Sequence, residues 1–187
     1  TLRRSSAASD VYKRQTLENA TGEAKETLQG VQDKYGFIPN LFGYMAEAPY
    51  TIDAYGFLDG LLEKTDLTPA QRQIGLLTVA NYHECGFCRV AHQAFSKMSG
   101  AKSQTVQAIL AGTKIEDAKD RTLVETLLAI VEGRGAISEE QLNLFFDAGF
   151  SRRNVYDLIL IATIKTLSNY SNHINKPEPN EQLLSML

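Results

Sequence analysis

Apolar residues recur every three or four positions through almost the whole chain after residue 15, and this spacing constrains the fold more than any other feature. The segments 51–63 and 151–172 show it most clearly. Such spacing places apolar side chains on one face of an α-helix. Sustained alternation of apolar and polar residues, which is typical of strands, is missing from the sequence. The sequence therefore predicts an all-α fold in which several helices pack as a bundle.

Capping residues divide this pattern into successive helices. Thr68 with Pro69 marks one helix start, because the hydroxyl can cap the first turn and proline has no N–H to leave free there. Ser138 marks another, since the two glutamates after it suit the positive end of the helix dipole. The tail from Lys176 carries two prolines and is expected to be extended. The predicted helices cover residues 23–35, 39–46, 51–63, 68–83, 85–100, 103–112, 122–131, 138–148 and 151–172.

The composition is that of an ordinary globular chain, with 43% hydrophobic and 22% charged residues and a net charge of -3. With so little net charge, no overall field attracts nucleic acid, and we expect no nucleic-acid partner. No apolar run approaches the roughly 20 residues of a membrane span, so no membrane association is expected. The two cysteines are too few for a secreted disulfide scaffold and indicate a cytoplasmic protein. Helices that are apolar on more than one side, such as 51–62 and 155–164, favour a homo-oligomer.

Residues 5–15 resemble the in-frame translation of a transposase sequencing adapter. The start of the chain holds Arg3 and Arg4 but no apolar core of the kind that a targeting peptide carries. We therefore expect residues 1–15 to be an adapter artefact outside the fold, with the natural N-terminus missing. Residues 16–187 are expected to form a single all-α domain, since no linker or internal repeat divides them.

The chemistry of the sequence is concentrated in one string, Cys85-Gly-Phe-Cys88-Arg-Val-Ala-His92, which holds both cysteines and one of three histidines. On a helix these three residues lie at positions i, i+3 and i+7, along one stripe of the surface. A helix N-terminus stabilises a thiolate, and His92 lies one turn beyond Cys88, where it can take the thiol proton. Cysteines at this spacing can also close a disulfide with little backbone movement. The string therefore indicates a redox-active dithiol at the N-terminus of a buried helix.

Other chemistries of paired cysteines fit the spacing less well. Haem attachment requires histidine directly after the second cysteine, where this chain has Arg89. A zinc site needs a fourth ligand, which His83 or Glu84 could supply, and the sequence has no second ligand pair. A thioredoxin motif needs a βαβ context. We expect no metal and no cofactor, while a metal-binding or purely structural helical protein stays open as an alternative.

The Cys-x-x-Cys-x-x-x-His string follows a helix that opens with Thr68-Pro69 and, earlier in the chain, Pro39-Asn40-Leu41. Together these residues resemble the alkylhydroperoxidase D-like (AhpD-like) branch of the carboxymuconolactone decarboxylase family, and within it a peroxidase-related subgroup. The segment 38–100 carries the likeness. The resemblance implies an all-α fold that assembles as a trimer or hexamer without metal or haem.

By position, the resemblance makes Cys88 the attacking thiol, Cys85 its resolving partner and His92 the proton acceptor. It implies a thiol-dependent peroxidase or disulfide oxidoreductase that reduces a small hydroperoxide or a partner disulfide and is restored by an external thiol or dithiol reductant protein. The branch named for decarboxylation lacks the cysteine pair, so that reaction is not expected. The alternative is a thiol redox sensor or binding subunit without turnover.

The chain departs from the family pattern at two relay positions. The relay glutamate corresponds to Gln73, which can form hydrogen bonds but cannot carry a proton at neutral pH. A relay histidine corresponds to Phe87. His83, directly before the string, is our candidate to replace the missing groups. These departures put peroxide turnover in question more than dithiol exchange.

Overall fold

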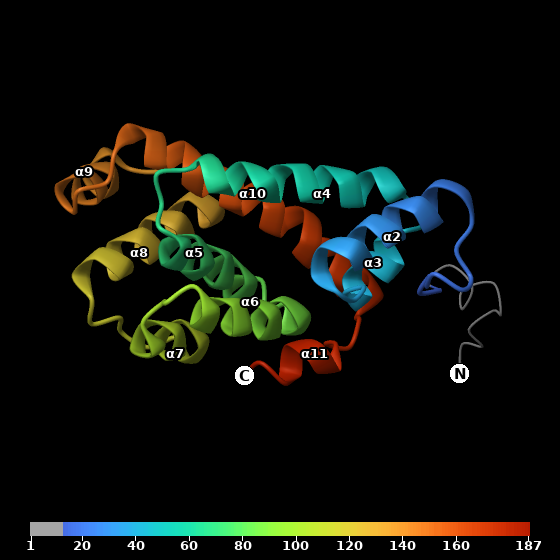
Figure 1. Ribbon diagram of the computed structural model, residues 1–187. Helices are drawn as coiled ribbons and strands as arrows, with labels where there is room; N and C mark the ends of the chain where they lie inside the picture. Colours follow the sequence, from blue (N-terminus) through green and yellow to red (C-terminus); the bar gives the residue numbers. More distant parts are fainter. Residues whose placement is uncertain (1–12) are drawn as a thin grey trace, which may run out of the picture.

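The computed structural model describes residues 13–187, and this part of the chain is helical without strands, which confirms the predicted all-α class (Figure 1). No helix within these residues is long and apolar enough to span a membrane. In chain order the elements are α2 (Gly22–Tyr35), α3 (Asn40–Met45), α4 (Pro49–Leu61), the 3-10 helix η1 (Leu62–Lys64), α5 (Pro69–Tyr82), α6 (Gly86–Met98), α7 (Ser103–Ala111), α8 (Ala118–Glu132), α9 (Glu139–Asp147), α10 (Arg152–Asn175) and α11 (Glu181–Leu184).

The helices α5 and α10 organise the others. The 24-residue helix α10 contacts α3, α4, α5, α6 and α8. The helix α5 packs against α6, α7, α8 and α10. Figure 1 shows α4 and α10 side by side along the molecule, with α9 at one end and α2 and α3 at the other. Side chains from α5, α6 and α10 therefore meet in the interior.

The buried apolar residues form two clusters. The larger one lies between α5, α7, α8 and α10, and includes the fully buried Leu77, Leu127 and Ile161. The smaller one joins α2, α3 and α4 to the start of α6, and it includes Cys85 and Cys88. The cysteine pair is therefore part of a packed core, which shields it from bulk water.

The capping signals in the sequence are confirmed. Thr68 Oγ1 accepts a hydrogen bond from the Gln71 N–H at 3.2 Å, and the Thr68 N–H donates to Gln71 Oε1 at 2.9 Å. This reciprocal pair fixes the start of α5. At α9, Ser138 Oγ accepts from the Gln141 N–H at 3.1 Å.

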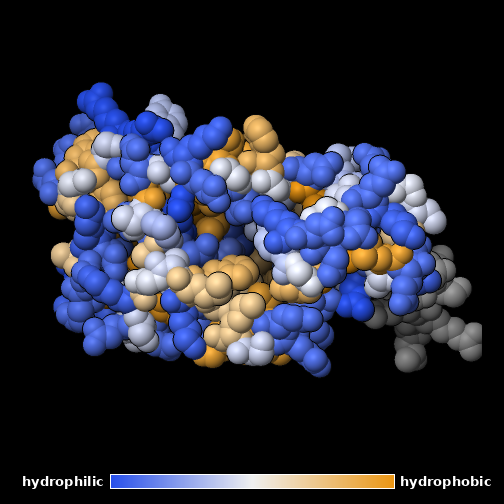
Figure 2. Space-filling view, viewed as in Figure 1, coloured by the Kyte–Doolittle hydropathy of each residue, from blue (hydrophilic) through white to orange (hydrophobic). Residues whose placement is uncertain are grey.

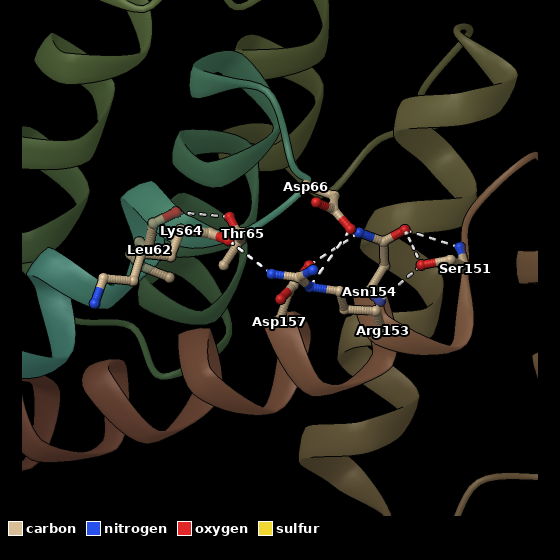
Figure 3. A network of polar contacts seen from close by, with 8 residues as sticks. All are labelled: Leu62, Lys64, Thr65, Asp66, Ser151, Arg153, Asn154 and Asp157. Carbon is tan, nitrogen blue, oxygen red and sulfur yellow. Dashed lines mark hydrogen bonds and ion pairs between the residues drawn. The ribbon is translucent and has the colours of Figure 1, made fainter.

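The start of α10 is capped in the same way and is also tied to the loop after η1 (Figure 3). Ser151 and Asn154 form the reciprocal capping pair. Arg153 donates to the Lys64 carbonyl oxygen at 3.1 Å and pairs with Asp66 at 3.5 Å. These contacts fix where α10 begins, and so they fix which residues further along the helix face the interior.

Two helix boundaries differ from the prediction by more than two residues. The helix α8 begins at Ala118, earlier than the predicted residue 122, because the Asp117 side chain caps it by accepting the Asp120 N–H at 2.9 Å. The helix α10 continues to Asn175 instead of ending at residue 172.

The prediction of an extended tail is wrong for residues 181–184, which form α11 and pack against α6. Asn180, just before this helix, donates to the Ile38 carbonyl oxygen at 3.1 Å and accepts the Asn40 N–H at 2.8 Å. The side chain of Leu183 is 2% exposed. Burial of this side chain and the two hydrogen bonds hold the short helix in place.

We expected residues 1–15 to be an adapter artefact outside the fold, and residues 1–12 of this segment lie outside the part of the chain that the structure describes. The three residues after them, which the sequence analysis also set aside, lie against α3. The Gln15 N–H donates to the Gly43 carbonyl oxygen at 2.8 Å, and the Arg14 side chain donates to Asn40. A Cβ at Gly43 would lie 2.7 Å from the Gln15 carbonyl oxygen, so only glycine permits this close approach.

The docking of α11 gives a first prediction. Leu183→Ala should lower the free energy of unfolding by about 2 kcal/mol, because it removes a buried leucine side chain. The matched control is Leu184→Ala, since Leu184 is 48% exposed and its loss should change the free energy by less than about 0.5 kcal/mol. Urea unfolding followed by circular dichroism measures both. Equal effects would contradict the packing of α11.

Candidate active site

The cysteine string lies at a tight junction between α5 and α6. Cys85 is the N-cap residue of α6, and its N–H donates to the Ala80 carbonyl oxygen of α5 at 3.0 Å. Glu84 makes the turn with a φ of 54°, in the left-handed region that few non-glycine residues adopt. Both cysteines are free, and their exposed fractions are 1% and 3%. The structure thus confirms a Cys-x-x-Cys pair at the N-terminus of a buried helix.

An amide from α10 holds both sulfur atoms. Asn172 Nδ2 lies 3.1 Å from Cys88 Sγ and 3.5 Å from Cys85 Sγ, as a donor to each. Asn172 itself is 4% exposed. The amide therefore links the two thiols before any disulfide forms, and it stabilises negative charge on either of them.

The two thiols have different proton affinities. A hydrogen bond donated by the Cys85 thiol to Cys88 is the largest influence on both, and it raises the pKa of Cys85 and lowers the pKa of Cys88. Burial opposes the lower pKa of Cys88, while the charge and hydrogen bond of Lys165 and the hydrogen bond from Asn172 support it. Cys88 is therefore the thiolate of the pair, and Cys85 keeps its proton.

His92 lies behind this thiolate and is buried. Its Nδ1 is 3.1 Å from Gln73 Oε1, and its Nε2 is 2.8 Å from Lys165 Nζ. The ammonium of Lys165 can only donate, so Nε2 accepts and Nδ1 carries the proton that is donated to Gln73. Burial and then the charge of Lys165 lower the pKa of His92 well below its ordinary value. The imidazole is therefore neutral.

Lys165 of α10 connects the imidazole to the thiolate, and sequence reasoning missed it. Its side chain is 0% exposed, and no carboxylate in residues 13–187 forms an ion pair with it. A buried ammonium needs a compensating charge, and the Cys88 thiolate supplies it. The sequence did contain one indication of this role: Lys165 lies four residues after Ile161 and therefore on the apolar face of the helix, where a lysine is unusual.

The structure brings Gln73, His92, Cys88 and Cys85 together, but it leaves His83 apart from them. His83 Nδ1 lies 3.0 Å from Asn169 Nδ2, and no hydrogen bond joins His83 to His92 or to either thiol. Burial, followed by the charges of His173 and Lys165, lowers the pKa of His83. Lys165, not His83, occupies the place between the relay and the thiolate.

A narrow apolar cavity of about 70 Å³ leads to this site. Cys88, His92 and Lys165 are among its few polar residues. Figure 2 shows apolar residues around a hollow near the middle of the visible face, over α6 and α11. The apolar side chains of the wall come from α3, α6, α11 and the loop before α3, and include Phe37, Leu41, Phe42, Phe87, Phe95 and Leu183. The cavity admits a small apolar group to the thiolate.

Metal ligands do not gather at this site. Within the described part of the chain, no group of three or more histidine, cysteine, aspartate or glutamate side chains is arranged to hold a metal ion. Of the two possible fourth zinc ligands considered from the sequence, His83 and Glu84, the first forms a hydrogen bond with Asn169.

Solved structures with the same arrangement of helices place this chain in a known fold class. An alkylhydroperoxidase AhpD core protein from Ralstonia eutropha JMP134, described as an uncharacterized peroxidase-related protein, is 22% identical, with a TM-score of 0.79 over 92% of this chain and 93% of its own. An uncharacterized peroxidase-related protein from Silicibacter sp. TM1040 is 19% identical, with a TM-score of 0.74 over 86% of each chain. The debrominase Bmp8, also solved with 2,3,4-tribromopyrrole, is 13% identical, with a TM-score of 0.71 over 94% of each chain.

The chain therefore has the AhpD-like fold, as the resemblance implied. No protein-family model and no curated protein matches the sequence. At these identities the similarity shows the fold, and the chemistry has to be argued from the site.

The site gives a second prediction. Lys165→Met should move the pH profile of Cys88 alkylation by iodoacetamide upward by at least about one pH unit, because the thiolate loses its counter-charge. In the wild type, Cys88 should still be alkylated below about pH 8.5, which is the ordinary pKa of a cysteine thiol. Lys114→Met, at an exposed lysine, should leave the profile unchanged. An unchanged profile in Lys165→Met would contradict the assigned role of Lys165.

Proposed function

We propose that this protein is a thiol-dependent oxidoreductase that cycles between the Cys85–Cys88 dithiol and its disulfide, and so reduces a small hydroperoxide or a partner disulfide. The observation that carries the proposal is a buried pair of free cysteines, both held by Asn172 Nδ2, with Cys88 and the buried Lys165 lining one apolar cavity. The fold, shared with peroxidase-related proteins, supports it. The debrominase has the same fold, so the fold alone does not choose the reaction.

In the first step, Cys88 Sγ attacks the terminal oxygen of a hydroperoxide, and the O–O bond breaks. One oxygen stays on the sulfur as a sulfenic acid, and the other leaves as an alkoxide. Lys165 lies within the cavity and is the donor that protonates this leaving group. His92 Nε2 holds the ammonium in position and can share its proton.

In the second step, Cys85 Sγ attacks the sulfur of the sulfenic acid. The S–S bond forms, and hydroxide leaves together with the Cys85 proton as water. The sum is one hydroperoxide, one thiolate, one thiol and one ammonium converted into an alcohol, water, a disulfide and a neutral amine. The thiolate and ammonium charges disappear together, so no uncompensated charge stays in the cavity.

A redox sensor without turnover is the second candidate. The observation that favours it is Gln73, because its neutral amide faces His92 where a carboxylate would help the imidazole to accept a proton. In a sensor, the same disulfide would change contacts with a partner instead of supporting repeated reduction.

We further propose that the protein acts in the cytoplasm as a homo-oligomer, a trimer or hexamer, and is recharged by an external thiol or dithiol protein. Large aromatic side chains are exposed on the adjacent helices α4 and α10, and Phe57 and Tyr156 are 69% and 73% exposed. Exposed aromatic side chains of this kind are suited to contact with a second copy of the chain. A reducing compartment is where an external thiol can restore the dithiol.

Peroxide consumption with dithiothreitol as reductant tests the main proposal. Wild type should turn over, and Cys88→Ser should fall to the uncatalysed rate because the attacking sulfur is gone. In a separate reaction without dithiothreitol, which would itself reduce a sulfenic acid, Cys85→Ser should react once and stop at the sulfenic acid, which mass spectrometry detects. A disulfide that forms without turnover would favour the sensor, and the absence of any Cys85–Cys88 disulfide after oxidation would overturn both redox functions.

A separate prediction concerns the relay. Gln73→Glu should raise the pKa of His92 by about 1 to 3 units, because a carboxylate beside the ring favours the imidazolium. An NMR titration of the His92 ring protons measures this shift. Gln71→Glu, on the same helix but bonded to Thr68, should leave the titration of His92 unchanged. No shift in Gln73→Glu would show that the Gln73–His92 contact does not control the ring.

A further inference from the structure

The two cysteines line different cavities. The apolar cavity is lined by Cys88 and not by Cys85, and a second cavity is lined by Cys85 and not by Cys88. Phe87 lines both. The other residues of the second cavity, which we call the Cys85 mouth, include Glu84, Gly86, Asn172, His173 and Lys176.

The two cavities differ in size and in polarity. The Cys85 mouth has a volume of about 420 Å³, against about 70 Å³ for the apolar cavity. Glu84, His173 and Lys176 at its rim are all exposed to solvent. A hydrophilic molecule too large for the apolar cavity therefore has room to bind next to Cys85 on this side.

A buried acceptor also lies at the Cys85 mouth. Asn172 lines this cavity, and while its Nδ2 donates to both sulfur atoms, its Oδ1 has no hydrogen-bond partner among residues 13–187. A buried carbonyl oxygen without a partner costs about 1–3 kcal/mol, which a donor on a bound molecule would recover. The mouth is therefore suited to a ligand that brings a donor to within reach of Asn172.

We propose that the reductant of this protein is a small anionic thiol that enters through the Cys85 mouth and attacks Cys85, while the substrate uses the apolar cavity at Cys88. This inference rests on the proposed dithiol cycle. The preference for an anion follows from Lys176 at the rim and from the first amides of α6, which no side chain caps. Glu84 at the rim opposes this preference.

The exchange reaction favours attack at the same sulfur. The incoming thiolate forms a bond with Cys85 Sγ, the Cys85–Cys88 bond breaks, and its electron pair leaves on Cys88 Sγ. The better leaving group is the thiolate that its surroundings stabilise: Asn172 donates to Cys88, and Lys165 supplies a positive charge beside Cys88 as it takes up the proton that the incoming thiol has released. A second thiol then attacks the outer sulfur of the mixed disulfide, releases Cys85, which takes a proton, and leaves as the oxidised reductant.

The experiment uses the oxidised protein and follows the return of its thiols. The disulfide is formed with a small excess of hydrogen peroxide and verified by mass spectrometry. Three thiols with the same two-carbon frame serve as probes: mercaptoethanesulfonate, mercaptoethanol and cysteamine, which are anionic, neutral and cationic. Rates are corrected for the fraction of each probe present as thiolate. Since the sulfonate lacks a donor for Asn172, the effect of charge is measured by the change in the rate ratio: Lys176→Glu should lower the ratio of sulfonate to cysteamine rates by about tenfold.

The matched control is Lys114→Glu, an exposed charge reversal away from the mouth, which should keep the wild-type ratio. A second variant, Gly86→Tyr, should slow reduction relative to oxidation by about tenfold, since a Cβ there meets no atom within 4 Å and the ring would fill the mouth. Peptide mapping after an acid quench should find the mixed disulfide on Cys85.

The outcomes separate this inference from the function beneath it. A mixed disulfide on Cys88, or rate ratios that Lys176→Glu does not change, would overturn the reductant site while leaving the dithiol cycle intact. Failure to form any disulfide with peroxide would instead overturn the proposed function itself.

Discussion

The buried ammonium of Lys165 is the constraint on which the rest of the site depends. A fully buried charge is stable only beside a compensating charge and hydrogen-bond acceptors. The Cys88 thiolate provides the charge and His92 Nε2 provides the acceptor. Because His92 must then carry its proton on Nδ1, it needs an acceptor there, and Gln73 is that acceptor. Lys165 on α10 thus determines the protonation of Cys88 and His92 on α6. It also requires a hydrogen-bond acceptor on α5, which Gln73 provides.

The helix α10 can carry this lysine because its buried face changes character along its length. In the middle of the helix this face packs into the larger apolar cluster, and nearer the C-terminus it becomes polar where α6 begins. The capped and ion-paired start of α10 sets the register for both parts (Figure 3). The buried apolar residues of this face are Leu158, Ile161 and Ile164, and the polar ones nearer the C-terminus are Lys165, Ser168, Asn169 and Asn172.

Local signals explain which parts of this structure the sequence could predict. Helical spacing, capping residues and the Cys-x-x-Cys-x-x-x-His string depend on neighbours within a few positions, and the structure confirms the elements that they indicate. Lys165 and Asn172 reach partners 73 and 84 positions away, so no local pattern marks them as part of the site. His83 shows the opposite case: it is adjacent to the string in sequence, but its hydrogen bond is to Asn169 and not to His92 or a thiol. The helix α11 was missed because only tertiary contacts of Leu183 and Asn180 stabilise so short a segment.

The separation of the two sulfur atoms between two cavities follows from the same electrostatics. In the proposed cycle, oxidation removes the thiolate and the ammonium charge together, so the apolar cavity holds no buried charge while the disulfide exists. A reductant that entered this cavity as an anion would have to shed its water among aromatic walls, and it would expel Cys85, which its surroundings stabilise less well as a thiolate than Cys88. A reductant that attacks Cys85 from the polar mouth expels Cys88 toward Lys165, and the original ion pair is restored when Lys165 takes up the proton that the incoming thiol has released. The asymmetry of the dithiol thus assigns the substrate to one side of the pair and the reductant to the other.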